Sequence, residues 1–361
     1  MKQTNKDITV VVGMSGGVDS SVAALLLKQQ GYNVVGVFMK NWEERSELSQ
    51  NCSAAKDWQD VSRICSKLDI PYYSMNFTEE YYEKVFTPFL EDYKKGLTPN
   101  PDILCNKEIK FKAFFDKAME LGADYVATGH YCHTKDGQLV KAKDGNKDQT
   151  YFLYAIDGKC LDKVKFPLGQ LEKPEVRALA KEHGLCTFDK KDSTGICFIG
   201  ERNFRDFMGQ YIKKEEGNFC LLDGTVVGKH QGTSFYTLGQ RRQLGLGGEG
   251  SRWFVIKKDL EKNIVYVTRE EKHPLLYSDA ILIDDLTWLH DSPSPLPYRC
   301  SAKIRYRQAD QNCTILKIQE GKALVHFDEP QKAVAVRQSV VFYDGDVCLG
   351  GGLVVSSQKT L

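Results

Sequence analysis

Two groups of residues in this 361-residue chain could carry chemistry: a glycine- and serine-rich turn near the N-terminus, and two cysteines in polar surroundings. The turn reads Ser15-Gly16-Gly17-Val18-Asp19-Ser20-Ser21 and follows a run of β-branched residues. Its glycines let successive backbone N–H groups face one anion, its serine hydroxyls add donors, and a helix starting there presents its positive end. An ordinary strand–helix turn that binds nothing is the alternative. The pattern in this strand and helix context predicts a diphosphate site.

The turn lacks the lysine of the G-x-x-x-x-G-K-[ST] pattern, which serves the β- and γ-phosphates. Its S-G-G-x-D-S order resembles the pyrophosphatase-loop family of ATP users, which split ATP between the α- and β-phosphates and transfer AMP to a substrate oxygen. That resemblance implies that the loop holds the departing pyrophosphate and that Asp19 helps to hold Mg²⁺. Residues expected to contact ATP are Gly13, Met14, Ser15, Gly16, Gly17, Val18, Asp19, Ser20, Met39 and Gly129. Met39 and Gly129 are included because they end predicted strands, where a doubly wound sheet binds its ligand, although a core methionine and an ordinary turn glycine also fit.

The two cysteines are Cys105 and Cys197. Cys105 lies in a segment, 98–107, whose prolines and asparagines predict a loop that ends where a helix over 107–121 begins. The field at the helix start and the adjacent Lys107 favour a thiolate, which a thiol with an unperturbed pKa of about 8.5 forms only rarely at neutral pH. Cys197 lies in a second polar loop with basic residues on both sides. We predict that both thiols are reactive. The alternative role, a small buried hydrophobe, is assigned to Cys65, Cys186, Cys313 and Cys348.

The composition excludes several classes of protein. With 49 Lys and Arg against 48 Asp and Glu, the net charge of +1 cannot steer the whole chain onto a polyanion. The 11 cysteines are odd in number and show no C-x-x-C or paired Cys/His spacing, which argues against a disulfide framework and a structural zinc site. The longest aliphatic run, Val22–Leu27, is far shorter than the roughly 20 residues that span a bilayer. The first residues lack the apolar segment of a signal peptide. We therefore expect a cytoplasmic protein with no membrane partner.

The first half of the chain alternates short apolar runs with helical periods. Strands are predicted over 8–14, 34–39, 71–77 and 125–128, and helices over 18–30, 54–68, 79–95 and 107–121. This alternation favours an N-terminal α/β domain with a doubly wound parallel sheet, and the loop resemblance places it among adenine nucleotide alpha hydrolase-like folds.

The second half has a different pattern. From about Asn263 the helical period fades, and short alternating segments indicate a small antiparallel barrel or sandwich; they are 264–268, 280–283, 300–306, 314–318, 323–327, 340–343 and 353–355. A zone rich in glycine and arginine, 201–258, separates the two halves. We predict a multidomain chain with a catalytic domain over 1–205, a small central domain over 206–275 and a C-terminal antiparallel β-barrel over 276–361.

Several segments in order along the chain resemble the family of bacterial tRNA-specific 2-thiouridylases. They are 13–21, 38–42, 98–112, 127–131, 192–203 and 239–242. The resemblance implies sulfur transfer to the wobble uridine of the tRNAs for Lys, Glu and Gln. ATP would adenylate the C2 oxygen of that base, and sulfur from a relay protein would ride on Cys197 as a persulfide and attack C2. Cys105 would then close a transient disulfide with Cys197 as the sulfur is released.

The same resemblance implies the residues that touch the tRNA. Asn100, Pro101 and Asp102 would surround the target base, with Asp102 as a catalytic residue beside the thiols. Further contacts would come from His130, Lys147, Asp148, Gln149, Arg305, Tyr306 and Gln338. A competing mechanism makes Asp102, Cys105 and Cys197 the ligands of a [4Fe–4S] cluster whose open iron carries sulfide, and the sequence is compatible with either. We expect a monomer whose partners are tRNA, bound partly by the central domain, and a sulfur-relay donor protein.

Two basic segments could meet RNA phosphates. Between Arg202 and Lys258, ten Lys and Arg stand against five acidic residues. Along 299–307 one face of an extended chain would carry Arg299, Ser301, Lys303, Arg305 and Arg307, although a solvated face is the more frequent role of such a stripe. The aromatic side chains of Trp42, Phe235 and Tyr236 could stack on a flipped base or fill a core. Gln243 stands where the family has glycine, which costs strain if the position needs a positive φ.

Two other functions share some of these features. An ammonia-using ligase of the same ATP class would keep the loop but would have no use for Cys105 and Cys197. An RNA-binding protein with a relic nucleotide loop would bind tRNA without converting ATP to AMP. Measuring AMP and pyrophosphate with and without tRNA separates the three functions.

Overall fold

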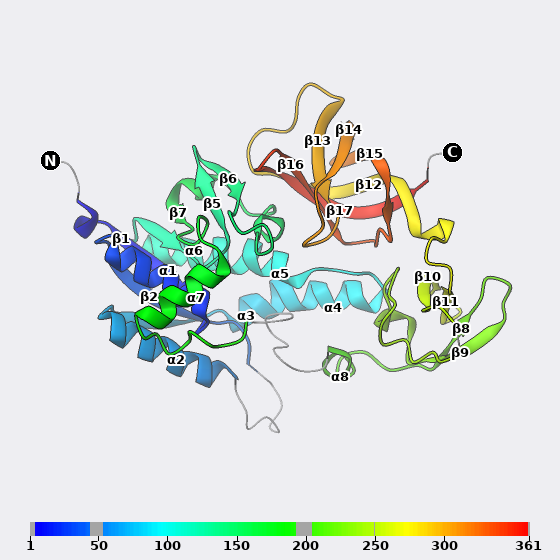
Figure 1. The fold of residues 1–361 in the computed structure, drawn as a ribbon, viewed down its shortest axis with the longest axis horizontal. Helices are drawn as coiled ribbons and strands as arrows, with labels where there is room; N and C mark the ends of the chain where they lie inside the picture. Colours follow the sequence, from blue (N-terminus) through cyan, green and yellow to red (C-terminus); the bar gives the residue numbers. More distant parts are fainter. Residues whose placement is uncertain (1–3, 44–52, 193–203, 249, 360–361) are drawn as a thin grey trace.

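The computed structural model describes residues 4–43, 53–192, 204–248 and 250–359 and arranges them in three units (Figure 1). The N-terminal unit, up to residue 192, lies at one end of the molecule, and helix α4 (Thr87–Lys94) runs from it toward the other two. In the view of Figure 1 the barrel unit, 277–358, lies above that helix, and the strands of the middle unit, 204–268, lie beyond its far end. None of the helices in the described ranges has the length and apolar character that crossing a bilayer requires.

The N-terminal unit is built on a five-stranded parallel sheet with the strand order β3-β2-β1-β4-β7. Its strands are β1 (Thr9–Met14), β2 (Asn33–Lys40), β3 (Tyr72–Asn76), β4 (Tyr125–Ala127) and β7 (Val164–Lys165). Successive side chains of a strand point to opposite faces. Val10 and Val12 therefore enter one core, whereas Val11 enters the other.

Helices cover both faces of this sheet, which is the doubly wound arrangement that the sequence predicts. The face of Val10 packs against α1 (Val18–Gln29), α2 (Ser53–Leu68) and α7 (Lys173–Glu182). The face of Val11 packs against the segment 78–120. This segment contains α3 (Thr78–Tyr81), the π-helix η2 (Tyr82–Phe86), α4, α5 (Pro101–Leu104), the π-helix η3 (Cys105–Ala113) and α6 (Phe114–Glu120).

The helix expected to start at Lys107 starts earlier, at Pro101, so the prediction of a loop around Cys105 is wrong. Asn100 caps this helix, and its side-chain oxygen accepts a hydrogen bond from the backbone N–H of Asp102 at 3.1 Å. Asparagine at the N-cap, proline at the first position and an acid in the first turn form a complete helix-start signal. The sequence analysis assigned those residues to a loop. Cys105 therefore lies in the second turn of a helical run.

The middle unit holds a four-stranded sheet of order β10-β11-β8-β9, in which β8 and β11 are parallel and the other pairs antiparallel. Its elements are α8 (Phe204–Met208), β8 (Gly217–Cys220), β9 (Val226–His230), β10 (Phe254–Asp259) and β11 (Ile264–Thr268). The segment 264–268 was grouped by its alternation with the later strands, although the predicted limits of the central domain, 206–275, include it. It completes the sheet of the middle unit by pairing with β8 and β10.

The barrel unit is a closed antiparallel barrel of six strands, which confirms the predicted C-terminal fold. Its order is β12-β15-β14-β13-β16-β17, and β17 pairs back onto β12. The strands are β12 (Tyr277–Trp288), β13 (Tyr298–Lys303), β14 (Gln311–Gln319), β15 (Lys322–Lys332), β16 (Ser339–Asp344) and β17 (Val347–Gln358). At Gly351 a Cβ atom would lie 2.3 Å from the Val340 carbonyl oxygen. Only glycine lets β17 approach its neighbour so closely.

The remaining elements are short; they are β5 (Cys132–Lys135), β6 (Gln138–Lys141) and the 3-10 helices η1 (Asn5–Asp7), η4 (Thr150–Phe152), η5 (Gly158–Lys163), η6 (Thr233–Phe235) and η7 (Pro274–Leu276). The strands β5 and β6 form a hairpin of the N-terminal unit. This hairpin joins the edge of the barrel through the pair Val140 and Val347.

Buried polar contacts join the three units near the end of α4. Lys258 of the middle unit donates hydrogen bonds to the carbonyl oxygens of Gly96 and Tyr236, and burial lowers the pKa of this lysine to about 8. Arg337 of the barrel unit pairs with Asp92 at 2.8 Å. The segment that leads into Cys105 is therefore held by contacts from both other units.

Candidate functional site

The turn between β1 and α1 has the geometry of an anion cradle. The Ser15 backbone N–H donates to Ser20 Oγ at 3.2 Å, and Ser20 Oγ donates to the Gly17 carbonyl at 3.2 Å. Gly16 has a φ of +72°, and a Cβ there would lie 2.7 Å from the Asp57 carbonyl oxygen. Among the described residues, no side chain caps α1 at Gly17. The first turn of α1 therefore keeps backbone N–H groups for an anion.

Gly129 lies directly against this turn, as the sequence predicts for a residue near the nucleotide. A Cβ at Gly129 would lie 2.7 Å from the Ser20 backbone nitrogen and 2.8 Å from the Asp19 carbonyl carbon. Met39 lies nearby, because its Cε is 3.0 Å from the place of a Cβ at Gly13. The structure thus brings the predicted ATP-contacting residues of three strand ends to one edge of the sheet.

Lys173, which the sequence analysis missed, connects this turn to the second cysteine segment. Its Nζ lies 2.7 and 2.8 Å from the two carboxylate oxygens of Asp19 and 2.8 Å from Asp192 Oδ1. Lys173 is 7% exposed, so its charge needs these partners. Asp192 is the last described residue before the segment that contains Cys197. The sequence contains one signal for Lys173, its position at the N-terminus of α7. Its partners Asp19 and Asp192 gave no signal, because they are far from it in the sequence.

Asp192 is held by further cations. Lys147 lies 2.6 Å and Arg177 lies 2.8 Å from its carboxylate. Partial burial works to raise the pKa of Asp192, but the hydrogen bonds from Lys147 and Lys173 outweigh it and bring the pKa down to about 2. The carboxylate is therefore ionised at neutral pH, and it anchors the chain beside the turn.

Lys190 fastens the turn from the other side. Its Nζ donates to the Gly16 carbonyl at 2.9 Å and to Asp57 and Asp60 at 2.8 and 2.7 Å. Partial burial opposes the charge of Lys190, but the hydrogen bonds to both carboxylates raise the pKa of this lysine. The cradle is thus tied to α2 as well as to α1.

The first thiol lies in a packed interior. Cys105 is fully buried in the hydrophobic cluster that also contains Val11 and Phe114. Pro101 is buried as well, whereas Asn100 and Asp102 are half-buried. The other predicted thiol, Cys197, lies outside the described residues, so its distance from Cys105 stays untested.

The structure tests the cysteines assigned to cores. Cys65, Cys313 and Cys348 are buried, as expected, but Cys186 is exposed, which makes its assignment wrong. Cys186 follows the end of α7, and the buried neighbours are Leu185 and Thr187 instead.

The side chains at the cradle fit a Mg²⁺ ion in part, whereas the ligands of the [4Fe–4S] alternative are only partly among the described residues. Asp19 offers one carboxylate at the cradle, and Mg²⁺ commonly takes one or two carboxylates together with substrate phosphates. The described ranges contain no cluster of three or more His, Cys, Asp or Glu side chains able to hold a metal. Because Cys197 falls outside these ranges, the iron–sulfur alternative is untested.

The predicted RNA-contacting residues of the N-terminal unit lie behind the cradle. His130 is 8% exposed, its Nδ1 lies 2.7 Å from Thr128 Oγ1, and burial followed by the nearby Lys110 charge lowers its pKa well below the usual value. Asp148 is buried and accepts a hydrogen bond from the Thr150 hydroxyl at 2.8 Å. Gln149 accepts one from the Tyr131 backbone N–H at 2.9 Å. These side chains hold the unit together in the structure.

Of the predicted RNA-contacting residues of the barrel unit, Tyr306 lies at the junction with the N-terminal unit, whereas Arg305 and Gln338 contact residues of the barrel unit itself. The ring of Tyr306 packs on that of Phe152 with centroids 4.4 Å apart. Arg305 is exposed and donates to the backbone carbonyls of Lys332 and Ala333. The backbone of Gln338 pairs with Val354 in the barrel wall.

The basic stripe expected along 299–307 does not form a continuous face. β13 ends at Lys303, which is only 9% exposed and lies within 4 Å of Asp148 and Asp310. Arg299 pairs with Asp328. Lys303 and Arg299 therefore lie beside carboxylates of this chain and do not form a shared basic surface. The three aromatic residues considered for base stacking also belong to a core, because Trp42, Phe235 and Tyr236 pack in the same cluster as Cys105.

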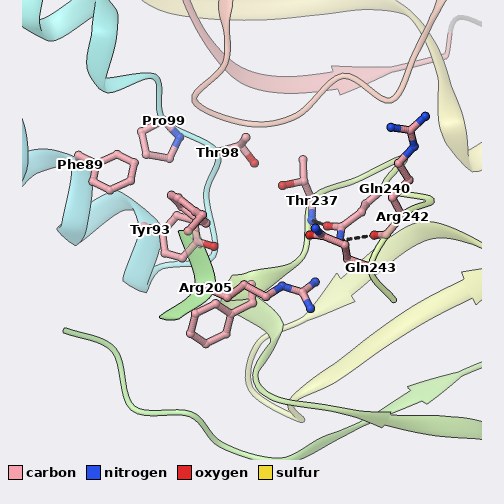
Figure 2. A pocket seen from close by; sticks show the side chains of 11 residues that line it. Phe89, Tyr93, Thr98, Pro99, Arg205, Thr237, Gln240, Arg242 and Gln243 are labelled. Atoms are coloured by element: carbon pink, nitrogen blue, oxygen red, sulfur yellow. Dashed lines mark hydrogen bonds between the residues drawn. The ribbon is translucent and has the colours of Figure 1, made fainter. Parts of the chain in front are cut away.

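A cavity of about 560 Å³ opens where the N-terminal and middle units meet (Figure 2). Its wall includes the end of α4, the start of α8 and the turn around Gln240. Gln243, on this wall, has a φ of +58°. That position therefore does need the left-handed conformation that the sequence analysis considered, and a non-glycine residue pays strain there.

Comparisons with known proteins agree with this architecture. Family models match the chain over residues 8–201 (tRNA methyl transferase HUP domain), 205–269 (tRNA methyl transferase PRC-barrel domain) and 278–354 (Aminomethyltransferase beta-barrel domain). The chain is 58% identical over 351 residues to the tRNA-specific 2-thiouridylase MnmA of Protochlamydia amoebophila, covering 96% of this chain and 93% of the relative. It is 56% identical over 360 residues to the same-named protein of Alkaliphilus oremlandii, covering 98% and 99%. A solved NMN synthetase from Francisella tularensis aligns with 20% identity and a TM-score of 0.33, covering 56% of this chain and 71% of that one.

Proposed function

Because the chain belongs to the tRNA-specific 2-thiouridylase family, and is therefore an enzyme of tRNA uridine 2-thiolation, we propose that it adenylates the C2 oxygen of the wobble uridine with ATP and replaces that oxygen with sulfur from a cysteine persulfide. The proposed substrates are the tRNAs for Lys, Glu and Gln. The proposed thiols are Cys197, as the persulfide carrier, and Cys105, as the second thiol.

One observation supports this proposal most strongly: the chain that leads into the Cys197 segment is fastened to the anion cradle. Lys173 bridges Asp19 of the cradle to Asp192. Asp192, the last described residue before the segment that contains Cys197, therefore lies at the anion cradle.

The first proposed step makes the uridine oxygen a leaving group. The C2 oxygen attacks the α-phosphorus of ATP, and pyrophosphate departs onto the backbone N–H groups of Gly16, Gly17 and the first turn of α1. Mg²⁺ bound at Asp19 would neutralise charge on the phosphates. The cation of Lys173 supplies further positive charge beside Asp19 in a half-buried site, where such charge is worth more than in water.

The second proposed step transfers sulfur. The outer sulfur of the Cys197 persulfide bonds to C2, and the C2–oxygen bond breaks with release of AMP. Cys105 then attacks the inner sulfur on Cys197, which forms the Cys105–Cys197 disulfide and leaves the outer sulfur on the base as 2-thiouridine. This is ordinary thiol–disulfide exchange, and a thiol reductant resets the enzyme.

The proposal is tested by the products. We expect incubation with ATP, a donor protein that carries a persulfide, a thiol reductant and unmodified tRNA to convert the wobble uridine to 2-thiouridine, detected by nucleoside mass spectrometry, with one AMP and one pyrophosphate for each sulfur introduced. AMP formation without sulfur incorporation would favour a ligase of the same ATP class. RNA binding without any AMP would favour a binding protein with a relic loop.

Exchanging Lys173 for methionine is expected to slow tRNA-dependent AMP formation about 100-fold, the usual cost of one preorganised charge in an active site. Methionine keeps most of the buried volume but leaves Asp19 and Asp192 without their shared cation. Pyrophosphate release with saturating tRNA measures the effect. Lys181→Met, at an exposed position of the same helix, is the matched control. Equal activity of the two variants would contradict a role for Lys173.

A further inference from the structure

The cavity at the junction of the units is built from parts of the chain that only the tertiary structure brings together. Phe89 and Tyr93 come from α4, Thr98 and Pro99 from the segment before Asn100, and the rest from the middle unit. Figure 2 shows these side chains around one hollow, with Arg205 and Arg242 on the side of the middle unit. The residues from the middle unit are Phe204, Arg205, Phe235, Thr237, Gln240, Arg242 and Gln243.

The wall combines aromatic rings with positive charge. Four of the lining residues are Phe or Tyr, of which Phe89, Tyr93 and Phe235 are buried and Phe204 is half-buried. The rings of Tyr93 and Phe204 meet at 73° with centroids 5.4 Å apart. The guanidinium carbon of Arg205 lies 4.9 Å from the ring centre of Tyr236. Two arginines and no acidic residue are found among the described residues that line the cavity. Aromatic surface beside guanidinium groups suits a nucleobase and its phosphate.

The arginine turn is held in place before any ligand arrives. The backbone N–H of Thr237 donates to Gln240 Oε1 at 3.0 Å, and Gln240 Nε2 donates to the Arg242 carbonyl at 3.0 Å. The backbone of Gln243, next to this turn, has the left-handed conformation. A strained, non-glycine conformation that is kept at a cavity wall is typical of a functional surface.

The opposite wall leads directly to the proposed target-base segment. Thr98 is tied to the barrel unit, because its backbone N–H donates to the Val336 carbonyl at 3.1 Å. Pro99 lines the cavity, and the next residue is Asn100, the N-cap of the helix that carries Cys105. The segment proposed to hold the target base is therefore continuous with the wall of this cavity.

We propose that this cavity is a subsite for a nucleotide adjacent to the target uridine, with the base against the aromatic wall and the phosphate at Arg242 and Arg205. The inference rests on the proposed function, because it needs an RNA substrate whose target base lies at 100–102. The cavity would act as a positioning site, because a neighbouring nucleotide held there keeps the target base out of the base stack. Stacking of the neighbouring base in the cavity offsets the free energy lost when the target base leaves its stack.

The test uses RNA hairpins with the anticodon loop, each lacking the base on one side of the target uridine. We expect one of the two abasic hairpins to bind wild-type protein about tenfold more weakly than the intact hairpin, the usual effect of losing one stacked base. We expect Arg242→Gln to weaken binding of the intact hairpin about tenfold and to reduce the dependence of log Kd on log salt by about 0.7, as the loss of one phosphate contact does.

Arg241→Gln is the matched control. Arg241 is exposed in the same turn but does not line the cavity, so its loss measures what one positive charge is worth there. Equal effects of the Arg241 and Arg242 variants on hairpin binding would overturn the inference. Full affinity for both abasic hairpins would overturn it as well, and this is the result expected if the cavity holds another part of this chain. Thiolation of the intact hairpin by wild-type protein is followed in parallel. If thiolation is normal, these negative results reject only the subsite; if it is absent, the proposed function fails as well.

Discussion

In a single turnover that starts from persulfide-loaded enzyme without added thiol reductant, Cys105→Ser is expected to abolish 2-thiouridine formation while tRNA-dependent release of AMP and pyrophosphate continues. A hydroxyl at this position cannot attack the sulfur on Cys197, so the outer sulfur stays attached to both the base and the enzyme. Nucleoside mass spectrometry measures the thiolated base, and a single-turnover assay with labelled ATP measures AMP. A tRNA-bound species sensitive to reductant should accumulate in this variant.

The control for this substitution is Cys65→Ser. Cys65 is as fully buried as Cys105 and lies in the same unit, but in the core on the opposite face of the sheet. Both substitutions bury a hydroxyl, which costs about 1–3 kcal/mol without a partner, so both variants should lose comparable thermal stability. Only Cys105→Ser should lose sulfur transfer. A Cys105→Ser protein that still makes 2-thiouridine at the wild-type rate would refute the second-thiol role.

Gly129→Ala is expected to weaken ATP binding at least 100-fold. The added Cβ would lie 2.7 Å from the Ser20 nitrogen and 2.8 Å from the Asp19 carbonyl carbon. Both are backbone atoms, which no rotamer change can move away. The strand end and the cradle must therefore separate, and the N–H groups that face the pyrophosphate lose their common direction. Equilibrium binding of a non-hydrolysable ATP analogue measures the loss.

Gly145→Ala separates this effect from a general cost of replacing glycine. Nothing lies within 4 Å of a Cβ at Gly145, and its φ is not in the left-handed range, so this variant should bind ATP like the wild type. Retention of tRNA binding by Gly129→Ala would show that the variant is folded. Wild-type affinity of that folded variant for the ATP analogue would mean that the cradle does not bind the nucleotide.

Much of the fold could be predicted because its signals are local. The β-branched runs that form β1 and β2 and the turn after β1 are contiguous in sequence, and their alternation indicates a parallel sheet. The short alternating segments of the second half likewise predicted a barrel. The domain limits near 205 and 275 stay predictions. The sequence does not predict the start of the helix at Pro101 unambiguously, because proline and asparagine are typical both of loops and of a helix N-terminus.

The charged residues show the limit of such predictions. Lys303 and Arg299 look like parts of a basic face in the sequence, but their partners, Asp148, Asp310 and Asp328, come from elsewhere in the chain. The partners of Lys173 carried no signal for the same reason. An ion pair forms between two residues that are close in space, and the sequence contains both residues without indicating which of them meet.

The sequence by itself determined the strand–turn–helix that makes the anion cradle, the presence of two polar cysteine segments and the class of each unit, because backbone preference and hydrophobic period act over a few neighbouring residues. Only the tertiary structure decided that Lys173 joins the cradle to Asp192, that Cys105 is buried in a hydrophobic cluster, and that two units enclose the arginine-lined cavity. These features depend on packing between residues far apart along the chain, where burial and charge pairing, rather than local preference, determine the free energy.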